Sequence, residues 1–391
     1  MRLRYLTGGE SHGPALSVIV EGLPAGLAVS SAAIDRELRR RMGGHGRGGR
    51  MRIERDRVEI LSGVRFGRTL GSPVTLVVRN LDHENWTDAM RPEGDRPAGA
   101  AARAVTRPRP GHADLAGALK LGTHDARDVL ERSSARETAA RTAAGALAKA
   151  LLHDLGTHVT SRTVAVGSAE APEAEASRFD EILALDDDAP LRTVDAAARA
   201  AMVAAIDDAR ARQDSIGGVF EVLARGVPPG LGSHVHWDRR IDGRIGGALL
   251  SIQAVKAVAI GEGIEAARRA GSEQHDAITY DREARAFVRP TNRAGGIEGG
   301  MTNGEIVRAR GYLKPVATLP RPLGTVDLVT KVESLAAVER TDTIPIVAAG
   351  VVGEAMVALV LADEMLIKFG GDTIAELARA VRSFRDGLRD Y

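Results

Sequence analysis

The amino-acid sequence predicts an α+β fold in which sheets and helices form separate layers. Short β-branched runs punctuated by glycine and proline indicate strands, and longer alanine- and leucine-rich runs indicate helices. The two kinds of segment do not alternate with the steady strand–helix rhythm of a doubly wound parallel sheet. The 391 residues could form one large domain or two or three average ones, and either arrangement buries enough surface for a stable core.

The first hundred residues are predicted to be sheet with one helix. Ser31 precedes a helical run through Met42, and the glycines that follow mark its end. We expect this helix to lead into a basic loop. The expected strands of this region are residues 3–7, 17–20, 58–61 and 74–78.

The rest of the chain contains the longer helices. Ser134 and Glu137 predict a capping box ahead of an alanine-rich helix over 138–155, with Gly156 as its C-cap. The acidic, aperiodic stretch 170–190 predicts an exposed connection and a candidate domain boundary. Further helices are expected at 194–212, 245–258 and 354–369, and further strands at 217–223 and 308–313.

Composition excludes several classes of function. Lys and Arg total 53 against 52 for Asp and Glu, so the formal charge of +1 gives no global attraction to nucleic acid or to an anionic membrane. Cysteine is absent, which excludes disulfides, thiolate nucleophiles and sulfur-ligated metals and suits a reducing cytosol. No run has the length of a signal peptide or a membrane span. We therefore expect a cytoplasmic protein without a metal centre that recognises anions locally.

Residues 9–13, Gly-Glu-Ser-His-Gly, match the G-x-S-x-G pattern of a hydrolase nucleophile. That pattern requires a helix after the serine, whereas Pro14 and an extended run follow here, so a serine hydrolase built on Ser11 is disfavoured. His12 in a glycine-rich turn suits a general acid near neutral pH. A turn residue that only hydrogen-bonds locally is the alternative, and both interpretations stay open.

Arginines surround the glycines of residues 39–52, among them Arg41, Arg47 and Arg50. Residues 44–49 also satisfy G-x-G-x-x-G, but a dinucleotide turn follows a strand and this one follows a predicted helix. The number of glycines favours a mobile anion clamp over a solvated basic face, because guanidinium groups bind phosphate or carboxylate bidentately.

Two further segments combine cations with predicted helix starts. Arg109 lies on a stiff proline-rich stretch, and His112 comes directly before a helix expected from about Ala113. Residues 132–137 offer hydroxyls, arginines and amides suited to an anion. Ordinary helix caps remain the alternative for both segments.

The glycine-rich run 291–304 is too long for a simple turn and predicts a loop that wraps a ligand. Residues 314–318 add a cation and a hydroxyl after the predicted strand. Asp342, two residues from Arg340, suits either a surface ion pair or a working base.

Taken in order, these segments resemble the chorismate synthase family across almost the whole chain. The matching motifs are GESHG at 9–13, RRRMGGHGRGGRM at 39–51, TRPRPGHAD at 106–114, RSSARETAAR at 132–141, TNRAGGIEGGMTNG at 291–304, KPVAT at 314–318 and RTD at 340–342. The local match is weaker around Ala257 and Ala259, where the family more usually has a glycine and an acidic residue.

The resemblance implies a β-α-β sandwich, with 1–391 as a single large domain, assembled as a homotetramer. It implies a lyase that eliminates the 3-phosphate and a C6 hydrogen from 5-enolpyruvylshikimate-3-phosphate to give chorismate, with reduced FMN as cofactor. His12 would protonate the departing phosphate, His112 would stabilise the reduced flavin, and Asp342 would take the flavin N5 proton onward.

The resemblance also assigns the binding residues. The substrate contacts implied are Arg41, Arg47, Arg50, Arg109, Arg136 and Arg340. The flavin contacts implied are Arg132, Ser133, Ser134, Gln253, Ala254, Gly299, Lys314, Pro315, Val316, Ala317, Thr318 and Arg340. Two alternatives stay open for the flavin. It arrives already reduced, or NADPH reduces it in contact with Arg41 and Arg47. The remaining rivals are a non-catalytic phosphate-binding module and a nucleic-acid binder, and two Trp, four Tyr and six Phe give the latter few stacking platforms.

Overall fold

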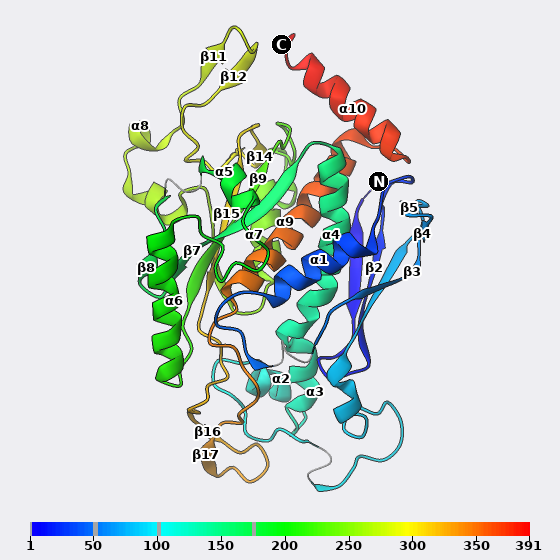
Figure 1. The fold of residues 1–391 in the computed structure, drawn as a ribbon, viewed down its shortest axis with the longest axis vertical. Coiled ribbons are helices and arrows are strands. Elements are labelled where there is room, and N and C mark those ends of the chain that lie inside the picture. The colour runs from blue at the N-terminus through cyan, green and yellow to red at the C-terminus, as the bar shows by residue number, and fades with distance from the viewer. Residues whose placement is uncertain (1, 50–53, 100–102, 174–176) are drawn as a thin grey trace.

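Two antiparallel sheets face each other across a layer of helices in the computed structural model, which describes residues 2–49, 54–99, 103–173 and 177–391 (Figure 1). The four-stranded sheet contains, in spatial order, β1 (Arg4–Gly8), β2 (Ala15–Glu21), β6 (Val74–Arg79) and β3 (Val58–Ser62). The five-stranded sheet contains β10 (Val255–Ile260), β15 (Val307–Leu313), β9 (Gly218–Arg225), β7 (His158–Val166) and β8 (Ala169–Glu170).

Three helices fill the space between the sheets: α1 (Ser31–Met42), α4 (Thr138–Asp154) and α9 (Ile346–Phe369). The inner face of the four-stranded sheet packs on α4 through β2 and β6, and the five-stranded sheet packs on α9 through β7 and β9. The two helices pack on each other, and one cluster of buried apolar side chains runs through all three layers. These layers confirm the predicted α+β class and the β-α-β sandwich.

The contact between α4 and α9 depends on a glycine. A Cβ at Gly145 would lie 2.2 Å from the Cβ and 2.5 Å from the Cα of Ala355. Distances this short leave no room for a side chain, because the obstructing atoms belong to the neighbouring helix itself. The small residues of the α4 sequence therefore allow two helices to fit between the sheets.

Helix α9 is the one helix of the described ranges that is long and apolar enough to cross a membrane, and it is almost entirely buried inside the protein. Its Glu354 is fully buried, where it accepts hydrogen bonds from Arg40, Lys149 and Ser161. A hydrophobic helix with paired acids, covered on all sides by protein, is a core helix. It begins at Ile346 rather than at Glu354 as the periodicity predicts.

The remaining elements surround this sandwich. The other helices are α2 (Asp114–Leu121), α3 (Arg127–Ser133), α5 (Phe179–Leu183), α6 (Ala196–Ala211), α7 (Ile241–Leu250), α8 (Gly271–Gln274) and α10 (Ile374–Gly387). Small hairpins are formed by β4 (Val64–Arg65) with β5 (Arg68–Thr69), β11 (Thr279–Asp281) with β12 (Ala286–Val288), β13 (Ile297–Glu298) with β14 (Met301–Thr302), and β16 (Gly324–Val326) with β17 (Glu333–Leu335). The β11–β12 hairpin projects from one end of the molecule (Figure 1).

The predicted helix over 245–258 is wrong. Helix α7 ends at Leu250, the chain turns through Ala254 at φ +67°, and β10 then pairs with β15. The apolar run 245–258, predicted to be one buried helix, contains the end of α7 and the start of strand β10. Its β-branched residues join the edge of the five-stranded sheet, where cross-strand pairing decides their conformation.

Two other local predictions need correction. The predicted capping box of Ser134 and Glu137 is wrong. Ser134 accepts a hydrogen bond from the amide of Arg136 and so caps the short turn before α4. Glu137 accepts from the hydroxyl of Thr7 instead of bonding back to Ser134. The C-cap of α4 is Leu155, and the left-handed Gly156 follows it. The stretch 170–190 is not wholly exposed, because two apolar side chains of α5 are buried.

Candidate active site

Segments from across the chain meet at a cavity of about 490 Å³. The β1–β2 turn, the loop after α1, the start of α2, the α3–α4 junction, the turn before β10 and two loops after β15 all contribute. Its polar and charged lining residues are Ser11, His12, Arg41, Arg109, His112, Ser133, Ser134, Arg136, Gln253, Lys314, Thr318, Glu339, Arg340, Thr341 and Asp342.

His12 is held from two sides in the turn between β1 and β2. Its Nδ1 lies 2.8 Å from Oε1 of Glu131 on α3, its backbone amide donates to the same carboxylate, and its ring stacks on Trp86 at 3.8 Å between centroids. Within the described ranges only Nδ1 of this ring has a hydrogen-bond partner, so Nε2 remains for a ligand. The carboxylate fixes the orientation of the ring, as a positioned general acid requires.

Glu131 is itself kept ionised. Burial opposes ionisation, but the hydrogen bonds from His12 and Arg127 outweigh it and hold the pKa of Glu131 below its usual range. The guanidinium of Arg127 donates to Glu131 at 2.9 Å and also lies over the ring of Trp86. Glu131 and Trp86 contact His12 and are candidate site residues that sequence reasoning missed, because neither belongs to a glycine- or arginine-rich motif.

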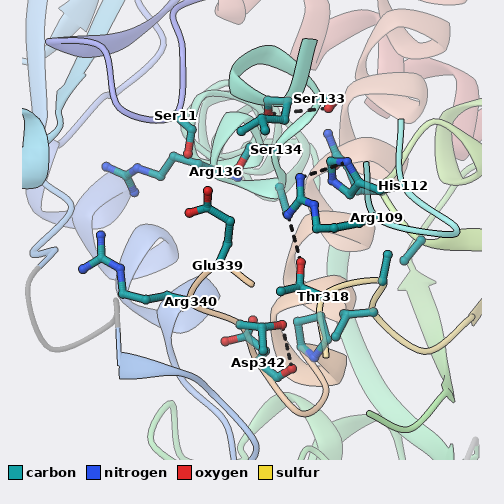
Figure 2. A pocket seen from close by; sticks show the side chains of 18 of the residues that line it. Ser11, Arg109, His112, Ser133, Ser134, Arg136, Thr318, Glu339, Arg340 and Asp342 are labelled. Atoms are coloured by element: carbon teal, nitrogen blue, oxygen red, sulfur yellow. Dashed lines mark hydrogen bonds between the residues drawn. The ribbon is translucent and has the colours of Figure 1, made fainter. Parts of the chain in front are cut away.

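A second histidine–carboxylate pair lies at the start of α2. Nδ1 of His112 is 2.5 Å from Oδ1 of Asp114, and Arg109 donates to the same buried carboxylate and to the hydroxyl of Thr318. Dashed lines in Figure 2 join Arg109 to His112 and to Thr318. Burial opposes ionisation of Asp114, but the hydrogen bonds from His112 and Arg109 hold its pKa well below its usual range.

Buried carboxylates anchor the other arginines on the wall of the cavity. Both oxygens of Asp56 accept from Arg136, at 2.6 and 2.7 Å, while Arg41 donates to the hydroxyl of Thr138 and to the carbonyl of Ala135. Both arginine residues are only 4% exposed, and these hydrogen bonds fix the positions of their guanidinium groups before any ligand binds.

Cations outnumber carboxylates among the lining residues. Two carboxylates, Glu339 and Asp342, line the cavity beside five cations, namely Arg41, Arg109, Arg136, Lys314 and Arg340. Three of these cations pair with carboxylates behind the lining, Arg109 with Asp114, Arg136 with Asp56 and Arg340 with Asp82, which fixes them as donors for an anionic ligand.

Asp342 is neither a lone surface group nor the partner of Arg340. Its carboxylate accepts from Nη1 of Arg47 at 2.8 Å and from the amide of Gly48 at 2.6 Å, while Arg340 pairs with Asp82. The carboxylate of Asp342 thus holds the loop after α1 against the cavity wall through these two hydrogen bonds. Because it remains a quarter exposed, it can still exchange a proton with a ligand.

One side of the cavity offers unused polar groups. Oε1 of Gln253 is buried and has no hydrogen-bond partner within the described part of the chain, and the next residue, Ala254, has a strained left-handed backbone. Lys314 lies on the same wall, where burial and the nearby charge of Lys256 lower its pKa. Together with the hydroxyls of Ser133 and Ser134, these groups suit an extended polar ligand.

The structure brings most of the predicted site residues together. Those that line the cavity are His12, Arg41, Arg109, His112, Ser133, Ser134, Arg136, Gln253, Ala254, Lys314, Val316, Ala317, Thr318, Arg340 and Asp342.

Five predicted residues stand apart from this lining. Arg47 binds Asp342 from behind, and Pro315 lies within a segment whose neighbours line the wall. The guanidinium of Arg132 donates to backbone carbonyls of the β1–β2 turn. Gly299 lies at the tip of the β13–β14 hairpin, so the run 291–304 is a folded hairpin that the cavity of the single chain does not include. Arg50 lies outside the described residues. Roles for these five stay predictions.

The two misleading motifs have the contexts expected from the sequence. Residues 9–13 join strand β1 to strand β2, so the strand–turn–helix setting of a nucleophilic serine is absent in this part of the described structure. Residues 44–49 follow helix α1 rather than a strand, which excludes a dinucleotide turn.

Comparison with known proteins agrees with this geometry. Residues 3–366 match the family model described as chorismate synthase. Curated relatives with that name include those of Solibacter usitatus, 53% identical with all of both chains covered, and Symbiobacterium thermophilum, 55% identical with 99% of this chain and 98% of the relative covered. A solved structure titled as the crystal structure of chorismate synthase superposes with a TM-score of 0.79 at 39% identity, covering 100% of this chain and 99% of the other. The chain belongs to the chorismate synthase family.

Proposed function

We propose that this chain is a carbon–oxygen lyase that converts 5-enolpyruvylshikimate-3-phosphate to chorismate and phosphate, the last common step of the shikimate pathway. The observation that carries the proposal is the pair of histidines, each hydrogen-bonded to a buried carboxylate, that line one cation-rich cavity. The substrate is a phosphate ester with two carboxylates, and five cations on the lining match that charge.

The first role concerns the leaving group. Phosphate departs from C3 with the electron pair of the C–O bond, and a proton donor beside that oxygen lowers the barrier. His12 is suited to this role, since Glu131 occupies Nδ1 and leaves Nε2 for the phosphate. Arg41 and Arg136 hold the anionic groups of the substrate, because their guanidinium groups are already fixed by neighbouring side chains.

Reduced FMN fits the unused polar wall of the cavity. The orphaned Oε1 of Gln253 and the hydroxyls of Ser133 and Ser134 offer hydrogen bonds to a flavin ring or its side chain, and Lys314 offers a positive charge to its phosphate. When bound, this cofactor supplies electron density for C–O bond cleavage and takes it back as C6 loses hydrogen. The elimination therefore has no net redox change.

The remaining groups handle charge and protons near the cofactor. His112, held by Asp114, places a polarised imidazole at the cavity and stabilises negative charge there. Asp342 accepts a proton, and its hydrogen bonds from Arg47 and from the amide of Gly48 keep the carboxylate oriented.

We also propose that the chain forms one domain, assembles as a homotetramer and works in the cytoplasm without nucleic acid or membrane. The single apolar cluster that passes through both sheets supports one domain. Exposed apolar side chains on the β11–β12 and β16–β17 hairpins support burial between subunits. NADPH as reductant would contact Arg41, which lines the cavity, and Arg47, which donates to Asp342.

Single-residue variants test these roles. We expect His12→Ala and His112→Ala each to lower turnover about 100-fold or more with modest loss of substrate affinity, as is typical for removal of a positioned acid or electrostatic group. Asp342→Asn should increase the isotope effect with substrate deuterated at C6. His234→Ala, on the exposed loop before α7, is the matched control. Turnover equal to that of the control removes the tested residue from its role.

A further inference from the structure

A second cavity, of about 270 Å³, lies on the other side of the α1–α4 contact. It is enclosed by α1, α4, the first half of β7 and the segment 183–192, and it shares no lining residue with the first cavity. Adjacent residues of α1 separate the two, since Arg40 lines the second cavity and Arg41 lines the first. The helices between them are the middle layer of the sandwich (Figure 1).

Arg192 on the wall of this second cavity is buried, at 4% exposure. Among the described residues its guanidinium donates only to neutral oxygens, namely the carbonyls of Ser161 and Ile182 and the hydroxyl of Thr160, while Glu37, Asp187 and Glu354 act on it without a direct hydrogen bond. Burying a charge is unfavourable unless an opposite charge compensates it. The pKa of Arg192 is accordingly lowered, with burial as the main cause.

The carboxylates nearby are already paired with other cations. Glu37 and Glu354 both accept from Arg40 and from Lys149. Asp187 accepts from Arg36 at 2.6 Å. The cations of the cluster are thus Arg36, Arg40, Lys149 and Arg192, and the carboxylates are Glu37, Asp187 and Glu354. The cluster therefore contains four cations and three carboxylates, so one positive charge has no carboxylate to compensate it.

Two histidine rings lie in contact on the wall of the cavity. The rings of His153 and His158 meet edge to face at 5.1 Å, and both line the cavity. Burial, His153 and Arg225 together lower the pKa of His158, and they outweigh the opposing effect of Asp180. This wall therefore disfavours additional positive charge, and the lining carboxylates, Glu37 and Asp187, are already paired with other cations.

We propose that the second cavity binds a small oxyanion, such as phosphate or a carboxylate, at Arg192 on the side where His153 and His158 line the wall. The anion would supply the missing negative charge and accept hydrogen bonds from the guanidinium and the imidazoles. The volume of the cavity suits a small ion rather than a nucleotide. This site is independent of the elimination reaction, because its lining takes no part in the first cavity.

Titration of the full-length protein with inorganic phosphate tests the proposal, with the ring signals of His158 followed by NMR over a pH series. We expect saturable binding in the micromolar to millimolar range and an increase in the pKa of His158 of about one pH unit, because a neighbouring anion favours the imidazolium. A parallel titration with acetate distinguishes a site for phosphate from one for any carboxylate.

Variants assign the effect to this cavity. Arg192→Gln should abolish the response of His158 to phosphate, and Arg192→Lys should restore part of it. Arg340→Gln alters the first cavity and should leave the response unchanged. The wild-type titration decides even if the Arg192 variants do not fold: a His158 pKa that is the same with and without millimolar phosphate overturns the proposal. A response that persists in folded Arg192→Gln overturns it as well.

Discussion

Replacement of Glu131 by glutamine removes the charge behind His12 while keeping the size of the side chain. Glu131 is 4% exposed and holds His12 through its Nδ1 and its backbone amide. Glutamine retains one carbonyl oxygen for such contacts but carries no charge. Arg127 keeps a carboxylate partner in the variant, because it also donates to Glu339 at 2.9 Å. The change is therefore directed at the hydrogen bonds that hold the His12 ring.

The expected magnitude follows from the hydrogen bond between the two side chains. Nδ1 of His12 and Oε1 of Glu131 are 2.8 Å apart. A hydrogen bond to a charged group contributes about 1.5–3 kcal/mol. If the ring that this carboxylate holds protonates the leaving phosphate, we expect Glu131→Gln to lower kcat about 10- to 150-fold. KM should change far less, because Glu131 has no place on the cavity lining.

Rescue by a second carboxylate separates this effect from a general structural one. Glu131→Asp should recover part of the lost kcat, since it restores a carboxylate behind His12, whereas Glu131→Gln should not. Asp128→Asn, an exposed residue on the same helix, is the control and should behave like the wild type. A folded Glu131→Gln protein with wild-type kcat would refute the role assigned to this pair.

Three further changes probe packing and buried charge through the free energy of unfolding in urea. Asp114→Asn removes the buried partner of Arg109 and should cost about 3 kcal/mol, and a loss below about 1 kcal/mol would contradict the role of that ion pair. Gly145→Ala should cost about 1–3 kcal/mol through overpacking between α4 and α9, whereas Gly247→Ala, in open space on α7, should stabilise by up to about 1 kcal/mol; equal effects would contradict the close helix contact. Arginines lower the pKa of buried Glu221 to about 2 against its burial, so its contribution is present above pH 4.5 and is lost as the pH falls toward 2. Glu221→Gln should therefore flatten the acid limb of the stability curve by about 3 kcal/mol, and an identical limb in the variant would exclude Glu221 as its source.

Much of the fold was predictable because its signals are local. The predicted helix is α1, Ser31–Met42, with Gly43 as its C-cap, and the short β-branched runs near residues 4, 15, 58 and 74 form strands of one sheet. The layers themselves are implied by the family resemblance, and the structure confirms them. The order of strands in each sheet has no local signal, since β6 inserts between β2 and β3 through long-range pairing.

The errors have a common physical origin in long-range contacts. Residues 255–260 form a strand because β15 pairs with them, although the apolar run before them suggested one continuous helix. Glu137 has the spacing of a capping residue, yet its carboxylate serves Thr7 on β1. At both positions a contact with a residue distant in sequence determines the local structure, which the local sequence pattern alone does not specify.

The candidate site shows the same division. Glycine- and arginine-rich motifs marked most of the cavity lining in advance. The carboxylates that position those groups were not predictable, because Glu131 lies 119 positions from His12 and Asp56 lies 80 positions from Arg136. The sequence around an isolated acidic residue in a helix does not indicate which distant residue it will contact.

Anaerobic conversion of 5-enolpyruvylshikimate-3-phosphate, with and without photoreduced FMN, tests the central claim most directly. Chorismate absorbance and phosphate release are followed in the same sample. The account predicts that both products form in equal amounts, only with reduced flavin present, and that oxidised flavin gives none. A folded protein that yields no chorismate with reduced FMN would contradict it and leave an anion-binding protein without this activity.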